Sequence, residues 1–385
     1  MTRPLSDRVG GVRDSATMAV EDLARRLRAE GREVVSLASG DPDFATPVHI
    51  SDAAHAAMLA GDTHYPPPRG NPRLVEAIVA KLRRENGVEI ESSPVIVAPS
   101  GKWALFVALG AILNPGDEVL VLEPAWVSYR PMIALNGGTA VGVPLAEPDY
   151  RITEAALRAA VTDRTKAVIV NSPNNPTGRV LTADEVDAIA AVARDADLYV
   201  ISDEIYEHLV FDGHRNPCLL ADPRIADRTL LVNGFSKAYA MTGWRLGWLA
   251  APDPVARLAL RLQSQALTSA SSVSMAGGIA ALDGPQACVG EMVAAYAVRR
   301  AMVVARLNAA GLPCPAPEGA FYVFPTVPGD DVAFARELLE AQGVAVVPGS
   351  AFGGPGHVRM TLAASAAHLE RAMDGIDRYM RARPV

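Results

Sequence analysis

Between about residues 47 and 281 the sequence alternates short apolar segments with longer stretches of helical periodicity, and this alternation restricts the possible folds more than any other feature. Strands that alternate with helices of this length form α/β units around a mostly parallel sheet. Helical patterns at 104–113 and 183–196 lie between the predicted strands, which are 95–98, 118–122, 167–170, 199–202 and 230–232. We therefore predict an α/β fold with a mostly parallel central sheet.

The two ends of the chain follow a different pattern. An amphipathic helix is expected at 18–30, followed by a strand at 34–40 that ends in a turn. Beyond a helical stretch at about 289–310, the segments AFYVFP, GVAVVP and HVRMTLA are typical of short strands in an α+β arrangement. Because 385 residues are too many for one simple core, we predict a large domain at 47–284 and a smaller one at 285–385. The pattern alone leaves open to which of the two the N-terminal segment 1–46 belongs, and we assign it to the smaller one.

The overall composition argues against several classes of protein. A net charge of −7 is unfavourable for general binding to nucleic acid. Cys218, Cys288 and Cys314 are far apart and form no C-x-x-C pair, so neither a disulfide framework nor a metal site is expected. The N-terminus lacks an apolar signal segment, and no stretch approaches the roughly 20 apolar residues of a membrane span. We predict a cytoplasmic protein that acts on small molecules.

Two of the predicted strands are followed by loops that suit a polar ligand, at the carboxyl ends where parallel sheets bind their ligands. After strand 95–98, Ser100 and Gly101 begin a helix, and the free N–H groups of a helix start suit a phosphate. An ordinary capped turn would have the same sequence. After strand 167–170, Asn175 lies in a proline-rich loop, which is either a rigid donor-rich site or a hydrophilic turn.

Two other predicted strands end in ionisable side chains. Asp203 follows the fourth strand, with Tyr206 soon after it; a carboxylate there suits a protonated ring nitrogen, or else the N-terminus of a helix. Lys237 follows the fifth strand, and Arg245 comes later in the same motif. Isolated lysines are usually solvated, but this apolar setting would lower the pKa of Lys237 and make it nucleophilic. An anion cradle, an acid, a phenol, an amide and a lysine together match the needs of pyridoxal 5'-phosphate (PLP).

The motifs and their order resemble one family over nearly the whole chain, from about residue 15 to the C-terminus. The chain is similar to the fold-type I, class I/II aminotransferases, and in particular to the bacterial aspartate aminotransferases. Single motifs are moderately specific, whereas all of them in this order are highly specific for the fold and for PLP. The motifs are LASGDPDFATP (37–47), THYPPPRGNPRLVEAI (63–78), PSGKWALF (99–106), GDEVLVLEPAWVSY (116–129), NSPNNPTG (171–178), SDEIYEHL (202–209), FSKAYAMTGWRLG (235–247), GAFYVF (319–324) and PGSAFG…HVRMT (348–361).

The resemblance implies a PLP-dependent aminotransferase that acts on an L-amino acid of the acidic type and a 2-oxo acid by a ping-pong mechanism. Lys237 would hold the cofactor as a Schiff base and move the substrate proton. Asp203 would pair with the pyridinium nitrogen. Tyr206 and Asn175 would hold the phenolate oxygen of the cofactor, and Trp126 would stack on its ring.

The resemblance also implies how the phosphate and the substrate are bound. Tyr65 would reach the phosphate in the neighbouring subunit, so we expect a homodimer with active sites at the subunit interface. Arg359 would clamp the substrate α-carboxylate bidentately. Lys102 would meet either the phosphate or the distal carboxylate of an acidic substrate. The residues around the phosphate would be Ser100, Gly101, Lys102 and Arg245, and those near the substrate would be Gly40, Lys102, Trp126, Asn175, Ser15 and Thr17.

Two features depart from the family pattern. Gly234 stands three residues before Lys237, where the family often has serine, so one phosphate-binding hydroxyl is missing. In the family, the segment that matches 262–278 commonly contains a Ser/Thr-rich run and faces the active site of the partner subunit. In this chain the segment is more apolar. Altered substrate scope or chemistry, or neutral drift at an interface, would explain the change. The positions concerned are Ala266, Leu267, Ala270 and Met275.

Two other functions share parts of this pattern. A PLP enzyme of the same fold can carry out β- or γ-elimination or replacement, decarboxylation or racemisation in a biosynthetic pathway. A transaminase converts its cofactor to the pyridoxamine form with an amino acid alone, whereas a lyase does not accumulate that form. A PLP-binding regulator would carry a fused DNA-binding domain, for which the sequence has no room before Ser15. The motifs therefore favour the aminotransferase.

Overall fold

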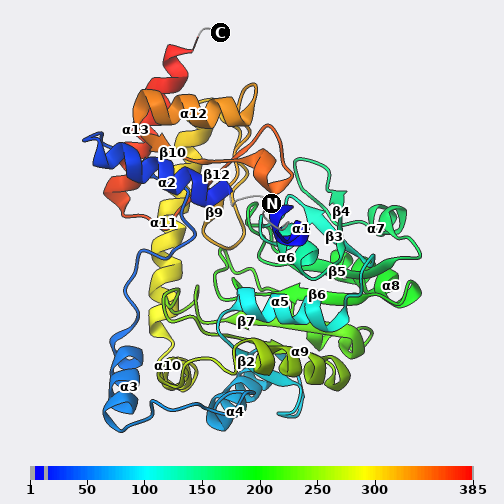
Figure 1. The fold of residues 1–385 in the computed structure, drawn as a ribbon. Coiled ribbons are helices and arrows are strands. Elements are labelled where there is room, and N and C mark those ends of the chain that lie inside the picture. The colour runs from blue at the N-terminus through cyan, green and yellow to red at the C-terminus, as the bar shows by residue number, and fades with distance from the viewer. Residues whose placement is uncertain (1–4, 13–15, 384–385) are drawn as a thin grey trace.

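The computed structural model describes residues 5–12 and 16–383, and it confirms the predicted α/β architecture. Its centre is a seven-stranded sheet with the strand order β2-β8-β7-β6-β5-β3-β4 (Figure 1). β8 runs antiparallel to both of its neighbours, whereas the other neighbouring pairs of this sheet are parallel. The strands are β2 (Val95–Ala98), β3 (Glu118–Glu123), β4 (Thr139–Pro144), β5 (Thr165–Asn171), β6 (Tyr199–Asp203), β7 (Thr229–Gly234) and β8 (Gly247–Ala250).

Apolar side chains on both faces of the sheet explain why most of its strands are visible in the sequence. Alternate residues point to opposite faces. Val119 and Val121 pack under α5 (Gly101–Ile112), α6 (Tyr129–Leu135) and α9 (Asp253–Ala266), whereas Leu120 and Leu122 pack under α7 (Glu154–Ala160) and α8 (Ala183–Asp195). The edge strand β4 is only partly buried and contains Gly142, so its pattern is weak and the sequence analysis misses it, as it misses β8. The helices around the sheet are α3 (Val48–Leu59), α4 (Pro72–Lys81), α5 (Gly101–Ile112), α6 (Tyr129–Leu135), α7 (Glu154–Ala160), α8 (Ala183–Asp195), α9 (Asp253–Ala266) and α10 (Ser272–Asp283).

The remaining elements surround a separate apolar core. The long helix α11 (Ala287–Ala309) runs from α10 towards α12 (Asp331–Gln342) and α13 (Ala366–Ala382) (Figure 1). The N-terminal helix α2 (Ala16–Ala29) packs through Ala24 against Leu339 of α12. An antiparallel sheet has the order β11-β12-β9, and β1 pairs in parallel with β10. These strands are β1 (Val35–Ser36), β9 (Tyr322–Val323), β10 (Val344–Ala345), β11 (Val347–Pro348) and β12 (Val358–Thr361).

The strand predicted at 34–40 is therefore shorter than expected, and its later residues form a loop instead. The division of the chain into domains near residue 284 remains a prediction. The other short elements are α1 (Asp7–Gly10), the π-helix η1 (Leu82–Asn86) and the 3₁₀ turns η2 (Leu219–Ala221), η3 (Ala226–Arg228) and η4 (Gly349–Phe352).

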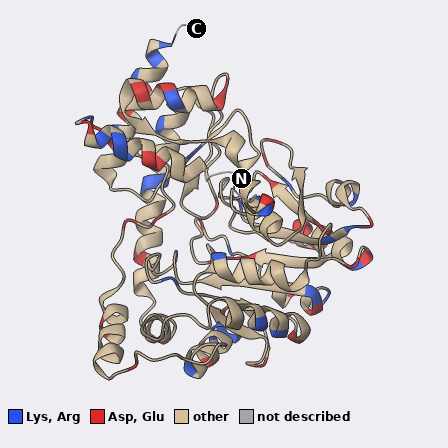
Figure 2. Ribbon diagram, in the orientation of Figure 1, with Lys and Arg blue, Asp and Glu red and all other residues tan. Residues whose placement is uncertain are grey.

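Charged residues of both signs are interspersed over the helices and loops (Figure 2). This mixture agrees with the modest net charge of −7 and with a surface that is not strongly basic. Among the described residues, no helix combines the length and the apolar character needed to cross a membrane.

Candidate active site

A cavity of about 410 Å³ lies at the carboxyl edge of the central sheet, where the sequence predicts a ligand site. Its walls come from the segments that follow β2, β5, β6 and β7, together with β12 and the loop after β1. Tyr65 lies outside this cavity and is 91% exposed, and Ser15 falls outside the described residues. The other predicted site residues all line the cavity: Thr17, Gly40, Ser100, Gly101, Lys102, Trp126, Asn175, Asp203, Tyr206, Lys237, Arg245 and Arg359.

Lys237 follows β7, and its amino group is enclosed by the cavity. Its Nζ donates a hydrogen bond to the carbonyl oxygen of Gly40, and it lies 5.6 Å from the ring centroid of Phe321 and 5.9 Å from that of Tyr206. Burial lowers the pKa of Lys237 to about 8; nearby carboxylates act against this shift and nearby arginines add to it. A substantial fraction of the amine is therefore neutral at mildly alkaline pH, when it can act as a nucleophile or a base.

Close packing of the strands explains why glycine precedes Lys237 at position 234. A Cβ atom at Gly234 would lie 3.0 Å from Gly247 Cα and 3.0 Å from the carbonyl oxygen of Leu246. Both are backbone atoms of the neighbouring chain segment, which would have to shift to admit a side chain. The pairing of β7 with β8 therefore leaves little room for a side chain at this position.

Asp203 stands at the end of β6 and is only 4% exposed. The Tyr129 hydroxyl donates to its Oδ2 at 2.7 Å, and the Ile205 N–H donates to its Oδ1 at 3.3 Å. Burial raises the pKa of Asp203 to about 6, although the hydrogen bond from Tyr129 acts against the rise. The ionised carboxylate thus lacks enough positive charge nearby, and a cationic group bound in the cavity would stabilise it.

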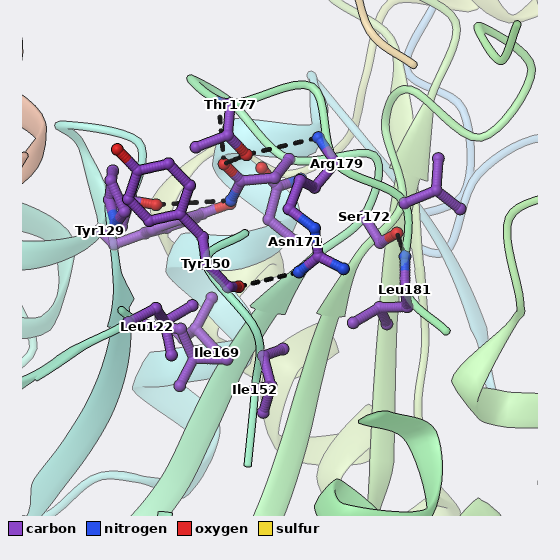
Figure 3. A pocket seen from close by; sticks show the side chains of 15 residues that line it. Leu122, Tyr129, Tyr150, Ile152, Ile169, Asn171, Ser172, Thr177, Arg179 and Leu181 are labelled. Atoms are coloured by element: carbon purple, nitrogen blue, oxygen red, sulfur yellow. Dashed lines mark hydrogen bonds between the residues drawn. The ribbon is translucent and has the colours of Figure 1, made fainter. Parts of the chain in front are cut away.

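Tyr129 and Asn171 line the main cavity and also a second, smaller one, which Figure 3 shows. The smaller cavity measures about 30 Å³, which admits a water molecule but not a cofactor. Asn171 Nδ2 donates to the backbone oxygen of Asp203 at 2.9 Å, and Asn171 Oδ1 accepts from the Asn175 N–H at 2.8 Å. The wall between the two cavities therefore holds Asp203 and Asn175 in place.

Arg359 reaches the main cavity from β12 and is 2% exposed. Its guanidinium lies between the rings of Tyr322 and Phe352, at 4.4 Å and 4.9 Å from their centroids. Nη2 donates to the carbonyl oxygen of Ala38 at 2.6 Å and Nη1 to Asn175 Oδ1 at 3.1 Å, whereas Nε has no hydrogen-bond partner among the described residues. A buried guanidinium with a free donor suits a carboxylate ligand.

The opposite part of the cavity carries two more cations. Lys102 Nζ lies 4.9 Å from the ring centroid of Trp126; burial lowers the pKa of Lys102, and the charge of Arg245 lowers it further. Ser100 has a φ of 113° and Arg245 a φ of 54°, which are rare for residues with side chains and typical of ligand sites. Ser100 Oγ accepts from the Trp103 N–H at 3.3 Å and caps α5. This part of the cavity suits an anion.

Several residues that line the cavity are not predicted as site residues from the sequence. Each of them lies within one of the quoted motifs, so motif membership was the signal available. Tyr129 supports Asp203, and Tyr322 stacks on Arg359. The residues concerned are Asp41, Tyr129, Thr242 and Tyr322.

Segment 262–278 does not present the surface that its apolar sequence suggests. Ala270 and Met275 are 2% and 0% exposed and belong to the core of the chain itself, where Met275 Sδ accepts from the Asn71 N–H at 3.2 Å. Internal packing therefore accounts for the apolar character of these two positions, whereas the expectation that the segment faces a partner's active site remains a prediction. Ala266 and Leu267, at the end of α9, are exposed.

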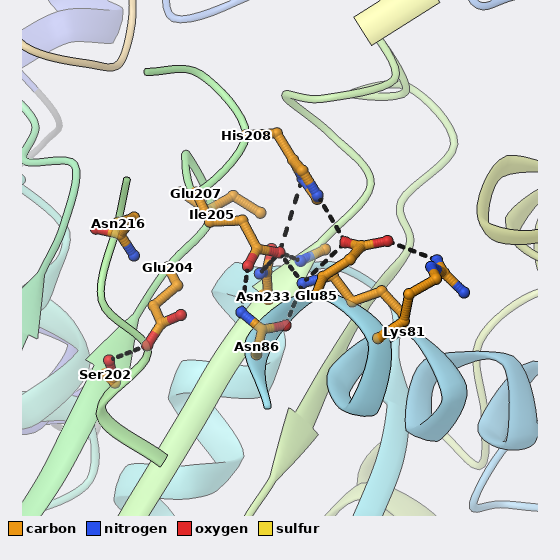
Figure 4. A network of polar contacts seen from close by, with 12 residues as sticks. Lys81, Glu85, Asn86, Ser202, Glu204, Ile205, Glu207, His208, Asn216 and Asn233 are labelled. Atoms are coloured by element: carbon orange, nitrogen blue, oxygen red, sulfur yellow. Dashed lines mark hydrogen bonds and ion pairs between the residues drawn. The ribbon is translucent and has the colours of Figure 1, made fainter. Parts of the chain in front are cut away.

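A buried polar network joins the loop after β6 to the end of β7 (Figure 4). Glu207 accepts hydrogen bonds from Lys81, from Asn233 Nδ2 at 2.6 Å and from Asn86 Nδ2 at 3.0 Å. Asn233 Oδ1 in turn accepts from the Gly234 N–H at 2.7 Å. Burial alone would raise the pKa of Glu207, but Lys81 and these hydrogen bonds bring it below its usual value. The network ties α4 and η1 to the loop after β6 and to the end of β7.

Lys81→Met is expected to lower the free energy of unfolding by about 3–5 kcal/mol, because it leaves the buried Glu207 carboxylate without its cation. The double variant Lys81→Met/Glu207→Gln, which removes both charges, should recover much of the loss. Urea denaturation measures each effect. Arg83→Met breaks an exposed ion pair with Glu89 and should change stability little. Equal stability of Lys81→Met and Arg83→Met would contradict the importance of the buried pair.

Comparisons with known proteins agree with this geometry. Residues 32–376 match the family model described as aminotransferase class I and II. The chain is 44% identical over 387 residues to the aspartate/prephenate aminotransferase of Thermus thermophilus, covering 98% of this chain and 99% of that protein. It is 38% identical to the aspartate aminotransferase of Bacillus subtilis, with 98% of each chain covered. The structure of the Thermus thermophilus aspartate aminotransferase with maleate superposes with a TM-score of 0.94 at 42% identity, covering 98% of this chain and 100% of that one.

Proposed function

The chain belongs to the aminotransferase class I and II family, and we propose that it transfers the amino group of an acidic L-amino acid, aspartate or glutamate, to a 2-oxo acid with PLP as cofactor. The observation that carries the proposal is the single cavity in which Lys237, Asp203 and Arg359 meet from three different strands. Relatives named aspartate aminotransferase support the acidic substrate. Since one cavity serves donor and acceptor in turn, the reaction has a ping-pong course.

The residues of the cavity fit each part of PLP. The Lys237 amine suits the aldehyde, and Asp203 gains its missing cation when a pyridinium nitrogen lies beside it. Tyr206 and Asn175 offer donors to the phenolate oxygen. Arg245 and the N-terminus of α5 suit the phosphate. PLP supplies an electron-withdrawing ring that weakens the bond between the substrate α-carbon and its hydrogen.

Arg359 and Lys237 divide the work on the substrate between them. The guanidinium of Arg359 binds the α-carboxylate through its free donor and holds the α-carbon in a fixed position, between the aromatic rings that keep the guanidinium in plane. Lys237 Nζ then accepts the proton of that α-carbon. In the second half of the cycle it returns a proton to the α-carbon derived from the 2-oxo acid.

Absorbance spectroscopy of the purified protein with a panel of amino acids tests this function. Aspartate and glutamate should each convert the cofactor to its pyridoxamine form without any acceptor, and mass spectrometry should detect the matching 2-oxo acid. 2-Oxoglutarate, oxaloacetate and prephenate are then added as acceptors and should restore the first spectrum where they are used. Release of ammonia without accumulation of the pyridoxamine form would contradict transamination and favour an elimination.

Lys102→Ala is expected to lower kcat/KM selectively for acidic substrates. Lys102 lies in the first turn of α5, where the helix dipole disfavours a cation by a few tenths to about 1 kcal/mol, so an anionic partner is needed. The distal carboxylate of the substrate is the proposed partner, and Thr17 also lines the cavity. Loss of a charge-assisted hydrogen bond costs about 1–3 kcal/mol.

The measurement compares kcat/KM for aspartate, glutamate and a neutral amino acid in wild type and Lys102→Ala. Lys166→Ala, which changes a lysine outside the cavity, is the matched control. An equal loss for all three substrates would assign Lys102 to the phosphate. No loss for any of them would show that Lys102 takes no part in binding.

We also propose that the active unit is a homodimer to which Tyr65 contributes across the interface. Tyr65 is 91% exposed, so replacing it leaves the core of its own chain intact. Tyr65→Phe is expected to weaken cofactor binding by about tenfold or more, the size of a lost hydrogen bond to a charged group. Equilibrium dialysis of PLP measures this loss.

Mixing Tyr65→Phe chains with Lys237→Ala chains tests the shared site directly. A heterodimer of these chains has one site with both native residues and another with neither. After subunit exchange, activity at limiting PLP should exceed the sum for the two proteins assayed separately. A fully active monomer at assay concentration, or no gain on mixing, would contradict the shared site.

A further inference from the structure

Tyr322 contacts both halves of the proposed active site. It lies on β9, is 1% exposed, and pairs with Thr361 of β12. Its ring centroid lies 4.4 Å from the guanidinium of Arg359, and its hydroxyl lies 3.0 Å from that of Tyr206. A single side chain therefore joins the residue proposed to bind the substrate carboxylate with a residue proposed to bind the cofactor.

Two neighbouring residues indicate that the hydroxyl of Tyr322 has a specific place. A Cβ atom at Gly40 would lie 2.6 Å from the Tyr322 hydroxyl oxygen, so glycine at position 40 leaves the room that this hydroxyl needs. Tyr296 is buried in the same aromatic cluster, yet its hydroxyl has no partner among the described residues. A hydrogen bond is thus not a general property of tyrosines in this cluster, and Tyr296 offers a natural control.

The hydrogen-bonding capacity of a phenol sets the direction of the Tyr322–Tyr206 contact. A tyrosine hydroxyl has one hydrogen to donate and an oxygen that accepts. If Tyr206 donates its hydrogen to the phenolate oxygen of the cofactor, its own oxygen is left to accept from Tyr322. A phenol that accepts a hydrogen bond becomes a stronger donor, because hydrogen bonds in a chain polarise one another.

We propose that Tyr322 is a positioning residue whose ring holds the Arg359 guanidinium in plane for the substrate carboxylate and whose hydroxyl donates to Tyr206, strengthening the donation of Tyr206 to the cofactor. This role presupposes the proposed function. The ring and the hydroxyl act on different partners, so each can be removed separately. Tyr322→Phe removes only the hydroxyl, whereas Tyr322→Leu removes the aromatic face as well.

The charged groups around the two phenols come from four elements. They are Arg359 on β12, Asp203 at the end of β6, Asp41 in the loop after β1 and Lys237 after β7. None of them changes in the proposed variants. A difference in cofactor titration between wild type and Tyr322→Phe therefore reports the hydroxyl.

The first arm measures the pH midpoint of the visible absorbance of the bound cofactor in wild type, Tyr322→Phe and Tyr296→Phe. When Tyr206 is a weaker donor, the phenolate oxygen of the cofactor keeps more negative charge. That charge holds a proton more tightly on the nitrogen that joins Lys237 to the cofactor. The pH midpoint of the absorbance should be higher in Tyr322→Phe than in wild type by about half a pH unit or more. In Tyr296→Phe it should stay unchanged. An unchanged midpoint in Tyr322→Phe, or the same rise in Tyr296→Phe, overturns the role of the hydroxyl.

The second arm measures the Kd of maleate, a dicarboxylate, by isothermal titration calorimetry on the cofactor-loaded proteins. Tyr322→Leu should raise Kd by roughly tenfold, the effect of losing a buried cation–π contact, while Tyr322→Phe should stay within about twofold of wild type. Circular dichroism confirms that each variant is folded. Conversion of the wild-type cofactor to its pyridoxamine form by aspartate tests the proposed function separately; equal Kd values for all variants in a wild-type background that passes this test overturn the role of the ring.

Discussion

Lys237→Ala is expected to abolish aminotransferase activity, with kcat reduced by at least about 10⁴-fold. Lys237 supplies the enclosed amine of the cavity, with a pKa that burial lowers to about 8, and the same amine is proposed to hold the cofactor and to move the substrate proton. Steady-state kinetics measures the loss. Borohydride reduction followed by mass spectrometry should attach PLP to the peptide that carries Lys237 in wild type, and should attach none to the variant.

Lys166→Ala is the matched control for this experiment, because Lys166 lies on β5 outside the cavity. It should keep the activity and the reducible cofactor of wild type. If Lys237→Ala still yields a covalent PLP adduct after reduction, another lysine holds the cofactor and the assignment of Lys237 is wrong.

Asp203→Asn is expected to lower kcat by about 10²–10³-fold, since it removes the buried carboxylate proposed to pair with the pyridinium nitrogen. Glu204→Gln is the control. Glu204 is the next residue and is equally buried, but burial raises its pKa to about 8 and it does not line the cavity. It is therefore largely uncharged at pH 7, and its replacement should leave kcat close to that of wild type.

The cofactor-free protein provides a second readout for Asp203. Burial raises the pKa of the Asp203 carboxyl in the folded chain from 3.8 to about 6, so the folded chain binds this proton more tightly than the unfolded chain. This contribution to stability is present below pH 4 and is lost as the pH rises through about 6, amounting to at most about 3 kcal/mol. Unfolding midpoints measured from pH 4 to 8 should fall in wild type and fall less in Asp203→Asn. Near-normal turnover of Asp203→Asn would contradict the pairing of Asp203 with the pyridinium nitrogen. Identical pH profiles of the unfolding midpoint in wild type and Asp203→Asn would contradict the raised pKa of Asp203.

Local sequence patterns were sufficient to predict the strand ends that are followed by Ser100, Asn175, Asp203 and Lys237. Each follows a buried strand whose apolar run is visible in the sequence, and parallel strands bring their carboxyl ends to one edge of the sheet. The order of the motifs and the family resemblance predicted the remaining site residues. The match to the family model supports the fold and the class of reaction. β8 itself was not predicted, and its direction could not have been, because an apolar strand has the same pattern in parallel and antiparallel pairing.

Pairing between distant segments determined the rest. Gly40 and Arg359 reach the cavity because β1 pairs with β10 and β12 lies between β11 and β9. The contacts of Tyr322 with Tyr206 and Arg359, the steric need for Gly234 and the burial of Met275 likewise join residues that are far apart in the chain or on different strands. Periodicity in a sequence reports whether a segment is buried. It does not report which other segment covers it, since that depends on how the whole chain packs.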